Sequence, residues 1–262
     1  MLSALVALIL VGLWVTDSAP TRRASTPPST ESRPAPNREV IPSSSTVAPF
    51  SLIATLHGPT SCYASSTSAT VTGSVDPSWS GATLGLPVIG MEHERLHVRL
   101  LRRPNNLTAW IAAPAASLTH TGYHVVVDLS TKRLLLYQRS KLVLQAPAVV
   151  GSAQYPTPIG SFFVALFAQA PNPAYGPFVV VTSAFANTVT DWEQEGAAMV
   201  AITGPLDTLA ALQGGGGQLS HGGIRLLDGD MARLRVMPAG TPIDVVATLN
   251  PARQSRAHHR HP

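Results

Sequence analysis

Apolar residues in this sequence occur in runs of strand length, and turn-forming residues separate them. Tyr123–Leu129 is rich in valine, the turn Ser130–Lys132 follows it, and Arg133–Gln138 and Lys141–Val150 continue as two further runs. Runs of this length joined by short turns predict consecutive antiparallel strands. The 23 prolines and 20 glycines agree with this interpretation, because both residues interrupt long helices. The chain is therefore predicted to be mainly β.

Further runs of the same kind continue to near the end of the chain. The predicted elements are strands at Ser161–Phe167, Phe178–Ser183, Ala198–Thr203 and Ile243–Ala247 and one short helix at Asp228–Val236. With the three strands that begin at Tyr123, they make up one β domain, predicted to span residues 119–248.

A smaller set of strand candidates precedes this domain. Leu96–Leu100 and Ala109–Ala112 show short alternating patterns, and turn-forming residues lie between them in Arg103–Asn106. Two alternating segments around such a turn are typical of antiparallel strands. Residues 49–118 are therefore predicted to form a small β module.

The two ends of the chain differ in composition from the predicted domains. Leu2–Val15 is apolar or small throughout, which is the length of a signal-peptide core and short of the roughly 20 residues of a membrane span. Residues 1–16 are predicted to be a signal peptide or an uncleaved signal anchor. Both forms stay open, because no basic residue precedes the run and Pro20 makes a poor cleavage site. Residues 17–48, rich in Pro, Ser and Thr, are predicted to be a disordered linker, and residues 249–262 a disordered basic tail.

Charge and motif content exclude several classes of protein. The formal net charge is +4 and basic residues form only short clusters, so no nucleic-acid interface is predicted. Gly214–Gly217 lacks the Lys-Ser/Thr pair of a phosphate-binding loop. The histidines of the tail have no carboxylate or cysteine at ligand spacing, so no metal and no other cofactor is expected. Cys62 is the one cysteine and is predicted to be an incidental free thiol in a flexible approach to the β module.

Six short motifs occur in a fixed order in the larger β domain. They are Gly151, Pro156–Phe162, Tyr175–Gly176, Ile202–Gly204, Ser220–Leu226 and Pro238–Ile243. Their order and spacing resemble the YkuD-type L,D-transpeptidase family, in an actinobacterial-like form. The resemblance covers about Tyr123 to Ala247 and implies a β-sandwich-type catalytic fold. The small β module resembles the SH3-like domains that precede catalytic domains in cell-wall enzymes.

The resemblance also identifies two departures at the positions that carry the family's chemistry. Members of the family form an acyl-enzyme on a cysteine, in a pattern of His, 14 to 17 residues, and then Ser/Thr-His-Gly-Cys. In this sequence Thr203 occupies the histidine position and Gly223 the cysteine position. Glycine has no side chain to acylate, and a threonine hydroxyl cannot act as a general base near neutral pH. No intact catalytic residue is therefore predicted, and Ser220 and His221 are the remaining weak candidates.

Substrate-binding roles follow from the resemblance for six residues around this loop: Tyr175, Gly204, Ser220, His221, Gly222 and Arg225. For several of these residues a purely structural role stays open. Tyr175 could cover substrate or pack in the core, and His221 could contact substrate or hold the loop. Arg225 could pair with a carboxylate of the stem peptide, or brace the domain through an ion pair with Asp228 or Asp230.

The function expected from these observations is a role in peptidoglycan organisation by an exported protein. The protein would lie in the extracytoplasmic cell wall, with the membrane contacted only through an uncleaved N-terminal anchor. On the favoured interpretation it is a degenerate L,D-transpeptidase that binds peptidoglycan stem peptides or regulates other cell-wall enzymes. The alternative is an active peptidoglycan acyltransferase that uses a non-standard nucleophile such as Ser220.

Overall fold

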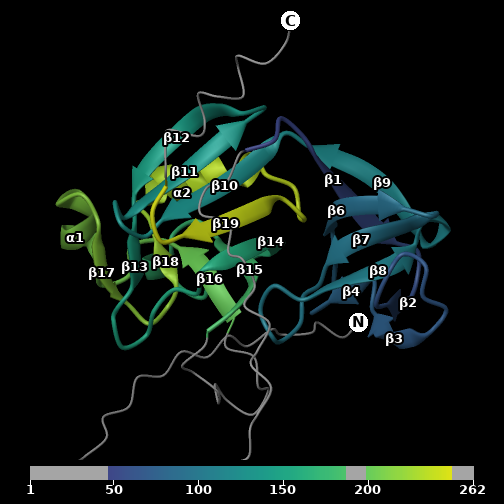
Figure 1. Cartoon of the computed structure of the whole chain (residues 1–262). Helices are drawn as coiled ribbons and strands as arrows, with labels where there is room; N and C mark the ends of the chain where they lie inside the picture. Colours follow the sequence, from purple (N-terminus) through teal and green to yellow (C-terminus); the bar gives the residue numbers. More distant parts are fainter. Residues whose placement is uncertain (1–46, 187–198, 250–262) are drawn as a thin grey trace, which may run out of the picture. The chain divides into compact units, whose positions relative to one another are not determined.

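The structure, a computed structural model, describes residues 47–186 and 199–249 (Figure 1). The predicted segment 1–16, most of the predicted linker 17–48 and all but the first residue of the predicted tail 249–262 lie outside the described residues. No helix in the described part is long and apolar enough to cross a membrane. The prediction of a mainly β chain is confirmed, because strands dominate both described ranges.

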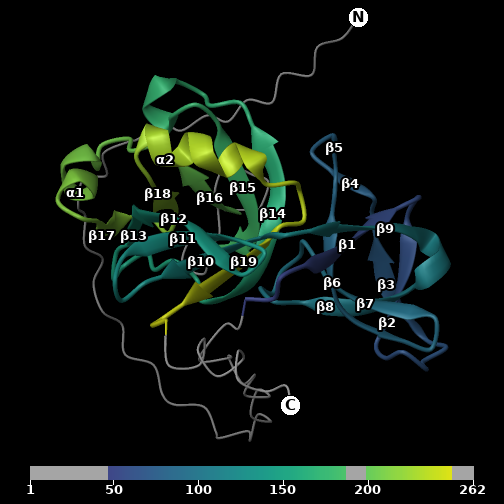
Figure 2. The ribbon, with the colours of Figure 1, turned by 90° about the horizontal axis from the view of Figure 1, so that it is seen from above.

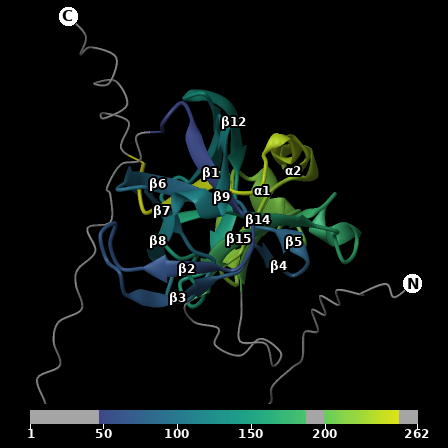
Figure 3. The same cartoon turned by 90° about the vertical axis from the view of Figure 1, so that its right-hand side faces the viewer.

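Seven strands of the first part of the described chain form one antiparallel sheet, in the order β3-β2-β8-β7-β6-β1-β9 (Figure 3). Their bounds are β1 Ser51–Leu56, β2 Thr60–Tyr63, β3 Val71–Val75, β6 Leu86–Glu92, β7 Arg95–Arg99, β8 Thr108–Ala112 and β9 Ala116–Thr121. The short strands β4 Ser78–Trp79 and β5 Ala82–Thr83 pair with each other, and the 3-10 turn η1, Ala113–Ala115, precedes β9. The module therefore contains more strands than the two segments singled out in the sequence.

Alternation along the central strands of this sheet separates a core face from an outer face. Leu96 and Val98 of β7 are fully buried, as is Ile111 of β8, whereas the residues between them are partly exposed. Cys62 of β2 lies in the same core, 3% exposed, so the expectation that it lies in a flexible approach to the module was wrong. Burial raises the pKa of its thiol, and the nearby positive charge of Arg102 only partly offsets this effect.

A second sheet of ten strands begins directly after β9, in the order β12-β11-β10-β19-β14-β15-β16-β18-β13-β17 (Figure 1). The described strands are β10 Tyr123–Asp128, β11 Arg133–Gln138, β12 Lys141–Pro147, β13 Val149–Gly151, β14 Gly160–Ala168, β15 Val179–Phe185, β16 Met199–Thr203, β17 Gly217–Ser220, β18 Ile224–Arg225 and β19 Pro242–Val246. The predicted meander is confirmed, because β10, β11 and β12 pair antiparallel in sequence order. The change from one sheet to the other falls at Gly122.

The helical elements of this domain are short. They are η2 Pro173–Tyr175, α1 Leu209–Gln213, α2 Asp228–Arg233 and η3 Leu234–Val236. The helix predicted at Asp228–Val236 corresponds to α2 and η3 together, and it lies across one face of the sheet (Figure 2). Met231 and Leu234 pack into the same core as the buried valines of β10, and Arg233 hydrogen-bonds to the carbonyl of Val143 on β12.

One predicted strand is divided in the structure. Lys141–Val150 was expected to be continuous, but β12 ends at Pro147 and β13 begins at Val149. Ala148 lies between them, and its N–H bonds to the carbonyl of Lys132 while its carbonyl accepts from Gly217. The chain thus leaves its pairing with β11 and starts a parallel pairing with β17 at this residue. This exchange of partners was not visible in the hydrophobic pattern.

The loop between β7 and β8 contacts the ten-stranded sheet at two strands. Asn105 donates to the carbonyl of Phe185 and accepts from its N–H, each at 2.8 Å. The Arg103 guanidinium donates to the carbonyl of Ala186 at 3.1 Å, and the N–H of Ser161 donates to Asn106 at 2.9 Å. The side chains of these predicted turn residues therefore hydrogen-bond to backbone groups at the ends of β14 and β15.

Candidate functional site

Thr203 and Gly223, the residues expected at the family's histidine and cysteine positions, lie at neighbouring ends of two parallel strands. β16 ends at Thr203 and β18 is Ile224–Arg225, and Thr203 pairs in register with Arg225. The parallel register brings the segment 199–203 beside the loop 220–225, although about 20 residues separate them in sequence. Thr203 and Gly223 therefore belong to one site.

The hydroxyl of Thr203 is fully engaged in hydrogen bonds. Nη1 of Arg225 donates to Thr203 Oγ1 at 2.6 Å, and Thr203 Oγ1 donates to the carbonyl oxygen of Gly204 at 3.1 Å. Thr203 is only 1% exposed. A neutral hydroxyl is a very weak base, and the hydrogen bond that it accepts from a guanidinium weakens its basicity further.

Gly223 borders the same guanidinium. A Cβ added to Gly223 would lie 3.2 Å from the carbonyl oxygen of Ala201 and 3.6 Å from Nη1 of Arg225. A small side chain would therefore fit here with a shift of a few tenths of an ångström, and it would point into a positively charged environment. The position is open to a thiol but holds none.

Ser220 is held inside the loop. Its Oγ donates to the carbonyl oxygen of Gly223 at 2.5 Å and accepts from the N–H of Gly222 at 3.2 Å, and the residue is 4% exposed. His221, the next residue, is exposed, and its ring lies 4.8 Å from that of Tyr155. Ser220 and His221 thus have different surroundings, and in the described ranges 47–186 and 199–249 the Ser220 hydroxyl bonds to backbone groups and to no base of the kind that nucleophilic catalysis requires.

Thr157 ties the loop 220–223 to the Pro156–Phe162 motif. Its Oγ1 accepts from the N–H of Gly151 at 2.8 Å and donates to the carbonyl oxygen of Gly222 at 3.0 Å. The N–H of Ser152 donates to the carbonyl oxygen of Ser220 at 2.8 Å. Motifs that lie far apart in sequence therefore form one hydrogen-bonded scaffold around position 223.

Tyr175 and Gly204 are also structural neighbours of the site. Tyr175 is 7% exposed and its carbonyl accepts from the N–H of Gly204 at 2.7 Å. Burial raises the pKa of Tyr175, with a smaller opposing effect of Arg225. The tyrosine side chain is thus mostly enclosed by its apolar cluster rather than exposed at a groove.

Arg225 is the charged group at the centre of this arrangement. Burial lowers its pKa, whereas Tyr175 and Asp207 favour the charged form, and a guanidinium stays protonated at neutral pH in any case. Asp228 and Asp230, the partners expected from the sequence, form no ion pair with it within the described residues. Arg225 instead donates a hydrogen bond to Thr203.

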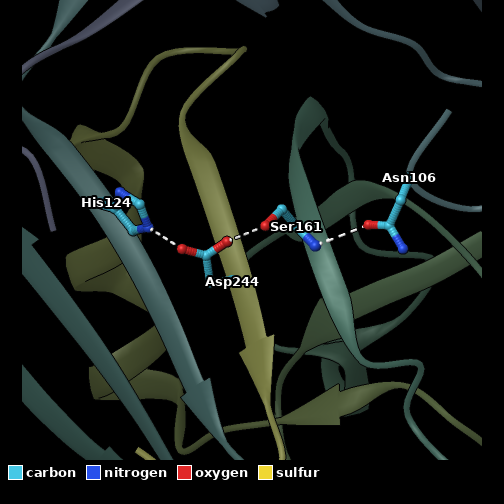
Figure 4. A network of polar contacts seen from close by, with 4 residues as sticks. All are labelled: Asn106, His124, Ser161 and Asp244. Carbon is cyan, nitrogen blue, oxygen red and sulfur yellow. Dashed lines mark hydrogen bonds and ion pairs between the residues drawn. The ribbon is translucent and has the colours of Figure 1, made fainter. Parts of the chain in front are cut away.

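A second polar cluster, missed in the sequence, spans β10, β19 and β14 (Figure 4). His124 Nε2 donates to Asp244 Oδ2 at 2.8 Å, and Ser161 Oγ donates to Asp244 Oδ1 at 2.6 Å. The cluster has the members of a Ser-His-Asp triad, but the carboxylate stands between the other two. His124 and Ser161 each bond to the carboxylate and not to each other, so the histidine cannot take the proton of the serine as it does in such a triad. Only the strand register brings these residues together, since 120 positions separate His124 from Asp244.

Asp244 is expected to make the stability of the domain depend on pH in the acid range. Burial opposes its ionisation, but the hydrogen bonds from His124 and Ser161 outweigh burial and hold the pKa of Asp244 below its ordinary value. A depressed pKa stabilises the fold above the unfolded value of about 3.9, and this contribution is lost as the pH falls through the folded pKa. Asp244→Asn should therefore lower the free energy of unfolding at pH 6 more than at pH 3, as measured by urea denaturation. Asp76→Asn at an exposed position is the matched control, and an equal loss at both pH values would contradict the prediction.

No group of three or more histidine, cysteine or acidic side chains suited to a metal ion occurs in residues 47–186 and 199–249.

Comparisons with known proteins identify the domain to which the site belongs. Residues 122–245 match the family model for the L,D-transpeptidase catalytic domain, YkuD. Similar solved structures include an L,D-transpeptidase from Mycobacterium smegmatis (18% identity, 61% of this chain and 81% of the other covered, TM-score 0.39) and one from Mycobacterium tuberculosis (18%, 58% and 76%, TM-score 0.40). Another is an L,D-transpeptidase in complex with imipenem (16%, 82% and 88%, TM-score 0.39). No curated protein matches the chain.

Proposed function

Because residues 122–245 form a YkuD-type L,D-transpeptidase catalytic domain, we propose that this protein binds peptidoglycan stem peptides in the cell envelope without cross-linking them. Membership of this domain family supports a role in the cell wall. Members act on peptidoglycan stem peptides and are typically extracytoplasmic, which supports the substrate class and the location proposed here. The apolar run Leu2–Val15 supports export.

The observation that carries the proposal is the pair formed by Thr203 and Arg225. Cross-linking in the family requires a thiolate and a base that accepts its proton, and the motif spacing assigns these groups to positions 223 and 203. Position 223 has no side chain, and the hydroxyl at position 203 accepts a hydrogen bond from a guanidinium. Two chemically unrelated substitutions in one site favour a scaffold that has lost its reaction.

Two of the residues expected to contact substrate are accessible to it. His221 is exposed and Arg225 is partly exposed, whereas Tyr175, Gly204, Ser220 and Gly222 are buried. A guanidinium offers five N–H donors, of which one is used by Thr203. We assign to Arg225 the binding of a stem-peptide carboxylate and to the four buried residues the shaping of the loop. A protein that occupies stems without consuming them would reduce the supply of stems to active cross-linking enzymes.

The alternative of an active transferase that uses Ser220 gains no support from the geometry. The Ser220 hydroxyl is buried and donates to Gly223, and no base lies beside it in the described structure.

Binding to a tetrapeptide-stem muropeptide tests the proposal, with the full chain and isothermal titration calorimetry. We expect binding that Arg225→Gln weakens about tenfold or more, because a charge-assisted hydrogen bond contributes about 1.5–3 kcal/mol. Lys141→Gln removes the same charge at an exposed position of β12 and should leave binding unchanged. Equal affinities of both variants would contradict the role of Arg225.

Intact mass spectrometry after incubation with imipenem tests the absence of chemistry. The wild-type chain should show no adduct, because no nucleophile is available at position 223. An adduct on any residue would overturn the proposal of a non-catalytic protein.

A further inference from the structure

The seven-stranded sheet carries a row of three rings on the face opposite its core. Tyr63 of β2 pairs with Trp110 of β8, and Trp110 pairs with His97 of β7. All three side chains are partly exposed. The residues next to them in sequence are buried in the core of the sheet, namely Cys62, Leu96, Val98, Ala109 and Ile111. We call the surface of Tyr63, Trp110 and His97 the aromatic face.

Two rings of the aromatic face, those of His97 and Trp110, lie against each other. The His97 and Trp110 rings are stacked, with centroids 4.6 Å apart and an interplanar angle of 8°. Gly90 of β6 is the cross-strand neighbour of His97, and a Cβ on Gly90 would lie 3.8 Å from Cη2 of Trp110. The indole therefore extends across β7 toward β6. Gly90 itself adds no side chain at the end of the indole.

Polar groups lie beside these partly exposed rings. His97 Nε2 and Thr108 Oγ1 are hydrogen-bonded at 2.8 Å, and the Arg95 guanidinium lies over the Tyr63 ring at 3.6 Å. Nη1 of Arg95 is buried and has no hydrogen-bond partner among the described residues, although an unused buried donor is destabilising. Glu92 pairs with Arg95 across the strands, and the charges of Arg99 and Glu92 both act on His97, so charges of both signs lie beside the rings. A purely apolar partner would leave these polar and charged groups without hydrogen-bond partners.

A pyranose chain has the matching chemistry, since each ring presents an apolar C–H face and a rim of hydrogen-bonding groups. We propose that the aromatic face binds a β-linked N-acetylhexosamine chain, the glycan component of peptidoglycan. This inference rests on the proposed function, because stem peptides are covalently attached to that glycan. Contacts to stem and glycan from one chain would raise the overall affinity for the polymer above that of either contact.

The test uses the full chain and chitotetraose, a soluble chain of four β-linked N-acetylglucosamine units, in isothermal titration calorimetry. Trp110→Leu keeps an apolar side chain but removes the ring, and it should weaken binding about tenfold, the size of an aromatic stacking contribution. Gly90→Leu keeps all three rings but places a side chain against the indole, and it should weaken binding in the same way. Leu118→Ala, at a residue 42% exposed on β9, is the matched control and should bind like the wild type.

Measuring chitotetraose binding and stem-peptide binding separately distinguishes a failure of the glycan site from a failure of the proposed function. Loss of chitotetraose binding in both Trp110→Leu and Gly90→Leu, with thermal unfolding and stem-peptide binding unchanged, supports the glycan site. A wild-type chain that does not bind chitotetraose overturns it, as does binding that both variants retain. Loss of stem-peptide binding while chitotetraose still binds counts against the proposed function alone.

Discussion

Gly223→Cys combined with Thr203→His is expected to give a protein that imipenem acylates, whereas the wild-type chain forms no adduct. A Cβ at position 223 fits beside Ala201, and the Arg225 guanidinium, 3.6 Å from it, would lower the pKa of a thiol placed there. An imidazole at position 203 would replace the hydroxyl that now holds Arg225 and would supply the missing base. The readout is intact mass, with peptide mapping to assign the adduct to position 223.

The single variants separate the two contributions. Gly223→Cys alone should acylate slowly, and the added histidine should accelerate the reaction about 10²-fold or more, the usual contribution of a general base. Thr203→His alone should form no adduct. Cys62 is 3% exposed, so a Cys62→Ser background serves as the control for reaction at the native thiol. A folded double variant that imipenem does not acylate would show that the binding surface had decayed as well, contrary to the proposed function.

Gly151→Ala is expected to destabilise the domain by about 3 kcal/mol or more, in the range of the most damaging core substitutions. A Cβ at this position would lie 2.2 Å from the carbonyl oxygen of Tyr155 and 2.4 Å from the backbone nitrogen of Thr157. Both atoms are backbone, so no side-chain rotation relieves the overlap. The substitution would also break the bond from the Gly151 N–H to Thr157, which holds the loop 220–223. Urea denaturation measures the loss.

Gly229→Ala is the matched control for this prediction. Gly229 lies in α2, and a Cβ there would meet no atom within 4 Å. The substitution should be neutral or stabilise the protein by up to about 1 kcal/mol, because alanine favours the helix over glycine. If Gly151→Ala lowered the free energy of unfolding no more than Gly229→Ala does, the close approach at Gly151 would be contradicted.

The sequence predicted the elements whose signal is local. The strands β10, β11, β14 and β15 and the helix at Asp228 follow from hydrophobic pattern and turn residues, and the bounds of β11 match the prediction. The short strands β17 and β18 were missed, because their pairing partners lie elsewhere in the chain, and the five-residue helix α1 was missed because it is too short to show a helical period. The change of pairing at Ala148 was missed for the same reason.

For the site, the sequence by itself determined which side chains are present. It identified glycine at position 223 and threonine at position 203, and a side chain that is absent cannot react in any fold. The assignment of these two residues to the family's histidine and cysteine positions rested on motif spacing. Spacing does not show which residues are in contact.

Only the tertiary structure decided what surrounds these positions. The parallel pairing of β16 with β18 brings Arg225 to Thr203. The same fold buries Ser220, and antiparallel pairing places His97 against Trp110 on an outer sheet face. The contacts of Arg225 and of His97 each join different strands, so they depend on the register between strands. That register is set by packing across the whole sheet, which no local sequence pattern specifies.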